Sequence, residues 1–204
     1  MKLFFAPGTC SLASHIILHE AGLPFDLVRV DLASGKTELG EDFRAINPKG
    51  YVPALLMDDG QLLTENQVIL QYVADQAQAR RLVPEFGSLA RYRMMEWLAF
   101  ISTEIHRGFG PLWNQQLPEV VHRLARERLA SRFDFVDQAL STQEWLGGDS
   151  FSIADAYLFT VLSWTAYHHI DLSAWPNLLA FQQRVSERSA VKAALKAEGL
   201  TPPA

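Results

Sequence analysis

The sequence predicts a two-domain fold, in which a small α/β domain is followed by an all-helical domain. Over the first 80 residues, short strand and helix patterns alternate in the order β-α-β and then β-β-α. Strand patterns then disappear, and all five tryptophans occur in the remainder. The join at residues 77–88 is short and contains Pro84 and Gly87. We therefore expect an α/β domain over residues 1–80 and a helical domain over residues 88–204.

Four strands and two helices account for the first domain. Short apolar, β-branched or hairpin-flanking runs predict strands over residues 2–6, 25–31, 52–57 and 61–64. Helical spacing of apolar residues predicts helices over residues 12–21 and 65–75. Gly22 stands where a helix C-cap is expected. The result is one mixed four-stranded sheet with two helices.

Helical patterns fill the second domain, over residues 89–108, 118–140, 152–167 and 175–196. The third of these helices has the best-marked start. The Ser152 hydroxyl can accept a backbone N–H of the first turn, and the Asp155 carboxylate can reach back to residue 152. We interpret Asp155 as a structural cap rather than a catalytic acid.

Composition excludes several classes of function. The chain has 18 Lys and Arg against 23 Asp and Glu, a net charge of −5, and no basic run. This balance argues against nucleic-acid binding and against attachment to anionic membranes. A single cysteine, Cys10, excludes an internal disulfide and a cysteine-rich zinc site. The N-terminal apolar stretch is too short for a signal peptide, so we expect a cytoplasmic protein with a reduced thiol.

Cys10 is the first candidate for chemistry. It stands directly before a predicted helix, where unpaired N–H groups and the helix dipole favour a thiolate, and Ser11 adds a hydroxyl in the first turn. The alternative is that a lone cysteine is simply a small buried apolar residue. Because no second cysteine follows, any redox cycle of Cys10 needs an external thiol.

Two further segments could bind a ligand. A cis Val52-Pro53 bond would turn the Val52 backbone towards a peptide-like ligand, although a proline that merely begins a strand explains the pattern as well. Glu65 and Asn66 begin the next helix, whose N–H groups suit an anion, while the Glu65 carboxylate suits an ammonium group. The alternative here is ordinary helix capping.

The helix predicted over residues 89–108 has a small and polar face formed by Ala99, Thr103 and His106. This face could line a cleft, and His106 with Arg107 could place positive charge near a thiolate. A solvated surface face is the alternative. The histidines show no metal-ligand spacing, and we expect no metal site and no cofactor.

Five segments together resemble the cytosolic glutathione transferases, most closely the bacterial beta class. They extend over nearly the whole chain and comprise residues 7–15, 47–55, 63–66, 96–109 and 151–159. The resemblance implies a thioredoxin-like first domain that binds glutathione, a helical second domain that contributes the electrophile pocket, and a homodimer. It implies a detoxifying transferase that uses glutathione as co-substrate.

The resemblance also implies roles for individual residues. Cys10, Ser11 and His106 would be the catalytic group, with His106 near Cys10. Glutathione would be bound by Cys10, Lys36, Val52, Pro53, Glu65, Asn66, Thr103, Glu104 and His106. The aromatic composition of the segment, and not the resemblance, places the hydrophobic electrophile near Phe109, Pro111, Leu112 and Trp113.

The sequence departs from the family pattern at four positions. Phe5 replaces a frequent tyrosine and cannot assist the thiol, and Ala99 replaces a common asparagine. Gly35 takes the place of a lysine, so the contact with the glycine carboxylate of glutathione passes to the adjacent Lys36. Asn66 replaces a smaller residue.

Three functions therefore remain open at this stage. The first is conjugation of glutathione to hydrophobic electrophiles. The second is thiol-disulfide or reductive chemistry through a mixed disulfide between Cys10 and glutathione. The third is a non-enzymatic role in binding hydrophobic ligands or another protein.

Overall fold

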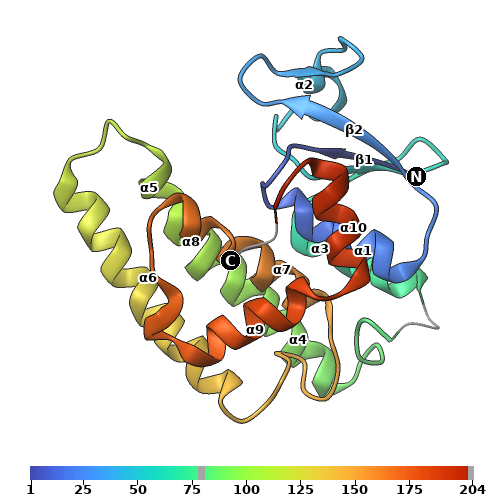
Figure 1. Ribbon diagram of the computed structural model, residues 1–204. Helices are drawn as coiled ribbons and strands as arrows, with labels where there is room; N and C mark the ends of the chain where they lie inside the picture. Colours follow the sequence, from blue (N-terminus) through green and yellow to red (C-terminus); the bar gives the residue numbers. More distant parts are fainter. Residues whose placement is uncertain (78–80, 202–204) are drawn as a thin grey trace. The chain divides into compact units, whose positions relative to one another are not determined.

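The computed structural model describes residues 1–77 and 81–201, which divide into two compact units (Figure 1). The first unit contains the chain up to Val83 together with the segment that begins at Ser186, and the second contains Pro84–Val185. The sequence-based division assigned all of residues 88–204 to the helical domain, whereas the structure groups the last helix with the α/β unit. The predicted ends at residues 80 and 204 lie outside the described residues.

Within the described residues, the sheet of the first unit has five strands in the order β3-β2-β1-β4-β5. Strand β1 (Lys2–Phe5) runs parallel to β2 (Asp26–Asp31) and antiparallel to β4 (Ala54–Leu56). The outer strands are β5 (Leu62–Thr64), antiparallel to β4, and β3 (Lys36–Thr37), antiparallel to β2. The prediction of a mixed sheet is confirmed, but its count of four strands was wrong. A two-residue strand is too short to leave a periodic pattern in the sequence.

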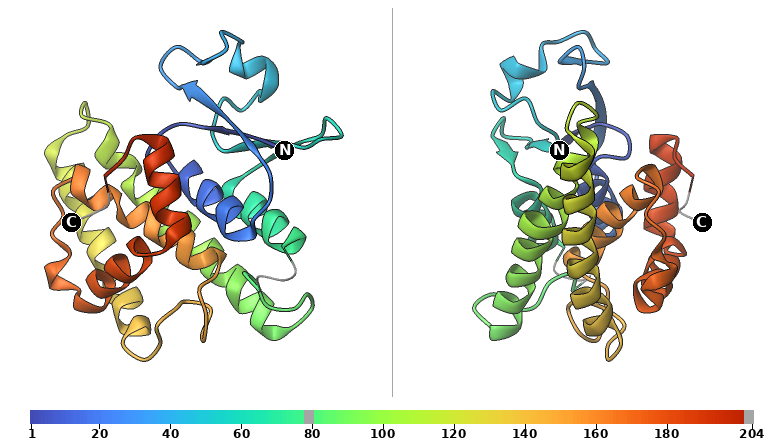
Figure 2. Two further views of the ribbon diagram at one scale, coloured as in Figure 1. Left: turned by 45° about the vertical axis from the view of Figure 1, so that its right-hand side comes forward. Right: turned by 90° about the vertical axis from the view of Figure 1, so that its left-hand side faces the viewer.

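Helix α1 (Ser11–Ala21) contacts both α3 (Asn66–Gln76) and α10 (Ser189–Glu198), and Figure 2 shows α1 and α3 side by side. Residues 11–18 are all buried, so α1 has almost no solvent-facing side. Burial of each large aliphatic side chain in this helix stabilises the fold by about 1.5–3 kcal/mol. The helix ends at Gly22, whose φ of 66° is a left-handed conformation that glycine adopts without penalty.

A short helix, α2 (Phe43–Ile46), lies between β3 and β4 in the sequence and was not predicted. Asp42 caps it, because its carboxylate accepts the backbone N–H of Arg44 at 2.9 Å. Phe43 packs into a small core with Phe4, Val28 and other apolar residues. This core fixes the segment that leads to residue 47 and the loop before β4.

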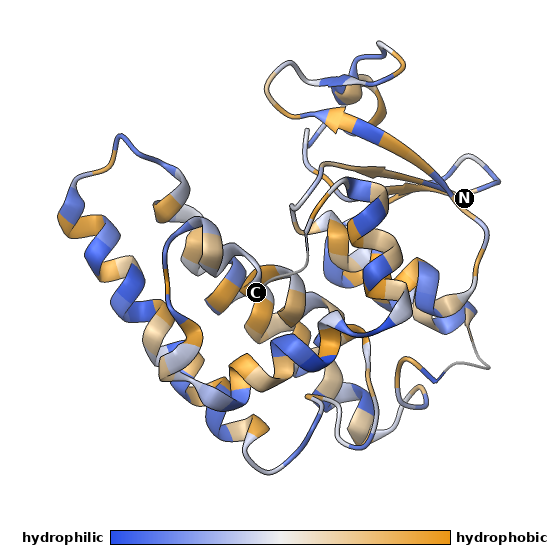
Figure 3. Cartoon of the chain, viewed as in Figure 1, coloured by the Kyte–Doolittle hydropathy of each residue, from blue (hydrophilic) through white to orange (hydrophobic). Residues whose placement is uncertain are grey.

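The regular structure of the second unit is made of helices joined by loops, within the residues described. Its helices are α4 (Leu89–Phe100), α5 (Gly110–Trp113), α6 (Glu119–Leu140), α7 (Ile153–Leu162), α8 (Trp164–Tyr167) and α9 (Pro176–Ser186). Along α6 the buried residues recur every three or four positions, and Figure 3 shows hydrophobic and hydrophilic residues alternating along this helix. This periodicity is the pattern from which its helical character was predicted.

Three predicted helices are interrupted in the structure. After α4, the winding changes to a π-helical turn (Ile101–His106) and then to a 3₁₀ turn (Arg107–Phe109). The predicted helix over 152–167 is divided at Ser163 into α7 and α8, and the one over 175–196 is divided into α9 and α10. At the second division, Arg188 has an extended backbone with ψ 137°.

Helix α7 is buried at every residue from Ile153 to Leu162 and contacts α4 and the π-helical turn. Its first turn forms the predicted capping box. The Asp155 carboxylate accepts the backbone N–H of Ser152 at 2.9 Å, the Ser152 hydroxyl at 2.6 Å and the Leu146 N–H at 2.8 Å. The interpretation of Asp155 as a structural cap thus agrees with its contacts. No helix among the described residues is long and apolar enough to cross a membrane.

Candidate functional site

Cys10 stands at the N-cap position of α1, at the end of a turn that begins at Ala6. The turn is closed by the Thr9 backbone N–H and hydroxyl, which donate to the Ala6 carbonyl at 3.2 and 2.9 Å. The thiol is half-buried, and its Sγ donates to the Val52 carbonyl at 3.3 Å. This contact brings together Cys10 and Val52, two residues to which the resemblance gives a role in binding glutathione.

Burial raises the pKa of the Cys10 thiol from 9.0 to about 12, and the negative charge of Glu65 adds to this effect. The backbone N–H groups of Cys10 and Ser11 act in the opposite direction, but more weakly. The sequence suggested a thiolate stabilised at the helix N-terminus. In the structure, desolvation outweighs the helix N-terminus because a charged sulfur loses more hydration than these N–H groups replace.

Ser11 is fully buried, and its hydroxyl is engaged with the turn rather than directed to a ligand. Its Oγ lies 3.2 Å from both the backbone N and the carbonyl O of Ala6, and 2.8 Å from the Thr9 hydroxyl. These contacts lock the segment that presents Cys10. They give Ser11 a structural function beside the catalytic one that the sequence suggested.

The Val52-Pro53 peptide bond is cis, which is the conformation that the ligand-binding interpretation of this segment required. Both side chains are buried. Asn47 braces the preceding loop, since its side-chain amide donates to the Tyr51 carbonyl at 2.7 Å. The loop that carries Val52 is thereby held beside the N-terminal end of α1.

Glu65 directly precedes α3 and has φ 71° and ψ 114°, an unusual backbone conformation for a residue other than glycine. Its side chain makes no capping hydrogen bond to α3, so the capping alternative does not describe it. Instead, Glu65 Oε1 lies 2.6 Å from the ammonium group of Lys49, which also donates to the Thr64 hydroxyl at 3.1 Å. The carboxylate is exposed and already bound to one ammonium group.

Asn66 is buried at the first turn of α3. Its side-chain Oδ1 accepts the Ser14 hydroxyl at 2.7 Å, which ties α3 to α1. Its Nδ2 is buried and has no hydrogen-bond partner among the described residues. A buried amide group without a hydrogen-bond partner lowers the stability of the fold by about 1–3 kcal/mol. The unpaired Asn66 amide at this helix N-terminus therefore indicates a site where a ligand could supply a hydrogen-bond acceptor.

Lys36 and Lys49, two of the lysines of the first unit, differ in position. Lys36 is exposed in β3, where it lies opposite Asp31 in the register with β2. Lys49, which contacts Glu65, was missed in the sequence because nothing in the local pattern connects residues 16 positions apart. The sequence feature that could have pointed to Lys49 is its place in the Asn47-Pro48-Lys49-Gly50 segment, which belongs to the family resemblance.

The remaining predicted residues, Thr103, Glu104 and His106, share the π-helical turn of the second unit. π-Helical turns occur often at functional sites. The exposed Thr103 donates its hydroxyl to the Ala99 carbonyl at 3.0 Å. Glu104 is held by Arg128 at 3.0 Å and by Arg132 at 2.8 Å, and these hydrogen bonds lower the pKa of its carboxyl.

His106 is half-buried, and its Nδ1 lies 2.7 Å from the Tyr157 hydroxyl. Its ring packs edge-on against Trp164 with centroids 4.9 Å apart. Desolvation, with a smaller contribution from the charge of Arg107, lowers the pKa of His106 to about 4. The imidazole is therefore neutral near pH 7, and it does not supply the positive charge that the sequence suggested.

Aromatic rings gather around the segment predicted to hold the electrophile. Trp113 is half exposed and packs against Trp164, Tyr167 and His168, with centroids 5.8, 6.1 and 4.3 Å away. Phe109 is fully buried beneath them, 5.6 Å from Trp164. Trp164 and Tyr167 were missed in the sequence, because nothing local links α8 with residues 109–113.

The described residues contain no group of three or more His, Cys, Asp or Glu side chains that could hold a metal ion. The chemistry available in the first unit is instead that of one thiol, a backbone carbonyl, one exposed carboxylate and a helix N-terminus with an unpaired amide. This set suits a ligand with peptide groups, an ammonium and a carboxylate.

Comparisons with known proteins identify the family. Residues 8–76 match the model of the glutathione S-transferase N-terminal domain, and residues 97–189 match that of the C-terminal domain. The chain is 49% identical to glutathione S-transferase GstA of Escherichia coli O157:H7, over 98% of this chain and 100% of that protein.

Two solved structures resemble it closely. One is a sphingomonad glutathione S-transferase complexed with glutathione, and the other is a bacterial beta class glutathione S-transferase of Sphingomonas chungbukensis. Each is 47% identical with a TM-score of 0.95, and each match covers 98% of this chain and 100% of the other. The chain therefore belongs to the glutathione S-transferase family, and its structural neighbours are bacterial beta-class members.

Proposed function

We propose that this protein is an enzyme that conjugates reduced glutathione to hydrophobic electrophiles. The observation that carries the proposal is the open donor at the start of α3, where the buried Asn66 Nδ2 has no partner among the described residues. A carboxylate at this helix N-terminus would accept from that amide and from the N–H groups of the first turn. The γ-glutamyl end of glutathione carries such a carboxylate, and a related sphingomonad transferase is known in complex with glutathione.

The rest of the tripeptide finds matching groups in the first unit. The Val52 backbone, beside the cis Pro53, would pair with the cysteinyl residue of glutathione as an added strand. Glu65 would take the ammonium group in place of Lys49, which contacts it at 2.6 Å. Lys36 would approach the glycine carboxylate. The glutathione sulfur would then lie near Cys10, whose Sγ is 3.3 Å from the Val52 carbonyl.

In this assignment Cys10 acts as a hydrogen-bond donor. A thiol whose pKa is raised to about 12 keeps its proton near pH 7. The S–H group of Cys10 can therefore donate a hydrogen bond to the thiolate of glutathione. The glutathione sulfur then attacks the carbon that carries the leaving group. A carbon–sulfur bond forms, the bond to the leaving halide breaks with its electron pair, and the proton lost by glutathione passes to solvent.

The second unit would contribute the electrophile pocket and further contacts to glutathione. Thr103 and His106 are the candidates for those contacts, whereas the Glu104 carboxylate is already bound to two arginines. The exposed rings of Trp113 and Tyr167 would bind an aromatic electrophile by offset or edge-on stacking, supported from beneath by the buried Phe109 and Trp164. We further propose that the enzyme works in the cytoplasm, where glutathione is kept reduced, and that it needs no cofactor besides glutathione.

We also propose a homodimer. Large apolar side chains remain exposed on two helices of the second unit, namely Leu89, Tyr92 and Met95 of α4 and Val120, Leu124 and Phe135 of α6. Such residues are typical of surfaces that a partner covers. Light scattering coupled to size-exclusion chromatography should give twice the chain mass of 22.9 kDa, and a monomer would contradict this part of the proposal.

The catalytic proposal is tested by kinetics with two substrates. The parent protein, Cys10→Ala and Asn66→Ala are assayed with glutathione and 1-chloro-2,4-dinitrobenzene, and separately with a glutathione mixed disulfide. We expect conjugation by the parent, retained conjugation in Cys10→Ala, and a raised KM for glutathione in Asn66→Ala. The substitution Gln67→Ala, at the next position of α3, is the matched control.

The same assays separate the two alternatives. If the protein only reduces the mixed disulfide and Cys10→Ala abolishes this activity, the protein works through a Cys10–glutathione disulfide and conjugation is not its function. If neither substrate is turned over and the protein does not bind immobilised glutathione, a non-enzymatic binding role replaces both enzymatic ones.

A further inference from the structure

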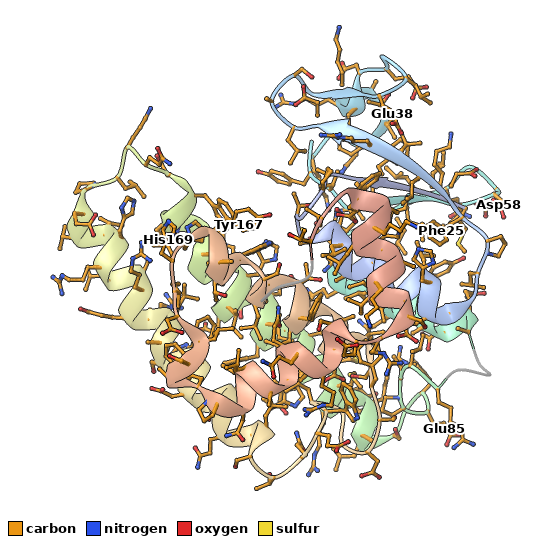
Figure 4. The ribbon with its side chains drawn as sticks, viewed as in Figure 1. Phe25, Glu38, Asp58, Glu85, Tyr167 and His169 are labelled. Atoms are coloured by element: carbon orange, nitrogen blue, oxygen red, sulfur yellow. The ribbon has the colours of Figure 1, made fainter. Side chains whose placement is uncertain are left out.

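The first unit contains a cavity whose lining includes none of the residues assigned to glutathione. It is an open cavity of about 450 Å³ at the C-terminal ends of α1 and α10 and the loop that leads into β2. Figure 4 shows Phe25, which lines it, beside α10. The lining residues are His15, His19, Leu23, Pro24, Phe25, Asp26, Leu27 and Ala197.

His15, at the floor of this cavity, has an unsatisfied polar atom. The side chain is fully buried, and its Nδ1 lies 2.9 Å from Glu198 Oε1. The other oxygen of Glu198 accepts the backbone N–H of Gly8 at 2.9 Å, so each oxygen of this carboxylate already has a partner. The remaining ring nitrogen, His15 Nε2, is buried and has no hydrogen-bond partner among the described residues. A buried polar atom without a partner calls for an explanation, and a ligand is one.

The walls of the cavity are aromatic and apolar. The His19 ring lies over His15 with centroids 5.0 Å apart, and the Phe25 ring meets both imidazoles edge-on at 5.1 and 5.6 Å. Desolvation lowers the pKa of His19, so this imidazole is neutral near pH 7. The one formally charged side chain in the lining is the exposed carboxylate of Asp26, and Glu198 lies behind His15. These two acids disfavour an anionic ligand.

We propose that this cavity binds a small neutral phenol, with its ring against Phe25 and His19 and its hydroxyl on His15 Nε2. A hydroxyl group both donates and accepts, so it pairs with Nε2 whichever ring nitrogen of His15 carries the proton. Because His15 Nε2 is buried, binding requires the half-exposed His19 side chain to move enough for the hydroxyl to reach it. An aromatic ring suits walls of this composition, because aromatic pairs favour edge-on and offset contacts.

The experiment is a ligand-observed ¹⁹F NMR titration of the full-length protein with 4-fluorophenol at pH 7, where the phenol is neutral. We expect saturable binding that is unchanged by excess glutathione. Fluorobenzene, which lacks the hydroxyl, should bind about 3- to 10-fold more weakly, since a typical hydrogen bond contributes that factor. 4-Fluorobenzoate should not bind.

Two variants locate the site. Ala197 is exposed on α10, so Ala197→Trp fills the cavity without disturbing the core, and it should abolish the binding. Ala193→Trp, one turn earlier on the same helix and outside the cavity, is the matched control and should bind as the parent does. Circular dichroism melts check the folding of both, and Ala197→Phe replaces the first variant if it is unstable. Unchanged binding in Ala197→Trp, displacement by glutathione, or equal affinity for fluorobenzene would overturn the proposal.

Discussion

The reactivity of Cys10 towards an aromatic disulfide tests whether burial or the helix N-terminus controls this thiol. With the pKa raised from 9.0 to about 12, the thiolate fraction at pH 7 is about 10⁻⁵, compared with about 10⁻² for the unperturbed group. The thousandfold deficit is partly offset, because a thiolate of higher pKa is more nucleophilic. With a Brønsted coefficient of about 0.4–0.5, a thiolate whose pKa is three units higher reacts about 20 times faster. We therefore expect the folded protein to react about 50-fold more slowly than the unfolded chain.

The assay follows release of 4-thiopyridone from 4,4′-dithiodipyridine by folded protein and by protein unfolded in urea. The chain has a single cysteine, so the whole signal comes from Cys10, and Cys10→Ser serves as the blank. For the folded protein, the rate should rise about tenfold per pH unit from pH 7 to 10 without levelling off. A rate that levels off below pH 8, or a folded protein that reacts faster than the unfolded chain at pH 7, would show that the helix N-terminus prevails over desolvation.

Three further predictions concern groups whose environments are equally well defined. Burial raises the pKa of Asp155 from 3.8 to about 6, so the folded state holds its proton more tightly than the unfolded state. Its contribution to the free energy of unfolding should fall by about 3 kcal/mol as the pH rises through that interval, and urea titrations of Asp155→Asn should lack this pH dependence. Ser11→Ala should lower the free energy of unfolding by about 1–3 kcal/mol in urea titrations, because it leaves the buried Ala6 N–H without its acceptor. Because the pKa of His106 is about 4, its ring carbon–proton NMR signals should not titrate between pH 5 and 8; a midpoint near 6.5 would contradict this.

Much of the fold could be predicted because it depends on local patterns. Alternation marks β2, helical periodicity marks α1, α3 and α6, and the Ser152–Asp155 spacing marks the start of α7. The cis bond at Val52-Pro53 was one of two alternatives, and the structure selects it. These features involve residues within one or two turns of each other, which is the range over which a sequence pattern carries information.

The remainder could not be predicted because it depends on contacts distant in sequence. The ion pair of Lys49 with Glu65 and the unpaired Asn66 Nδ2 become visible only when β4, β5 and α3 are assembled. The raised pKa of Cys10 is likewise a property of its surroundings, since the sequence shows the helix N-terminus but not the desolvation that opposes it. The helical spacing of apolar residues over residues 89–108 gives no sign of the π-helical turn at residues 101–106.

The attachment of α10 to the first unit affects the order in which this chain can fold during its synthesis. Gly8 and His15 have as hydrogen-bond partners the two oxygens of Glu198, which follows them by 190 and 183 positions. At about 5–20 residues per second, roughly 10–40 s of translation separate donor from acceptor. During that interval, water must solvate the Gly8 N–H and the His15 ring, and the face of α1 that α10 covers stays open. In a nascent chain, the turn that carries the thiol therefore has only its local hydrogen bonds, and it lacks the contact with Glu198 until α10 has left the ribosome.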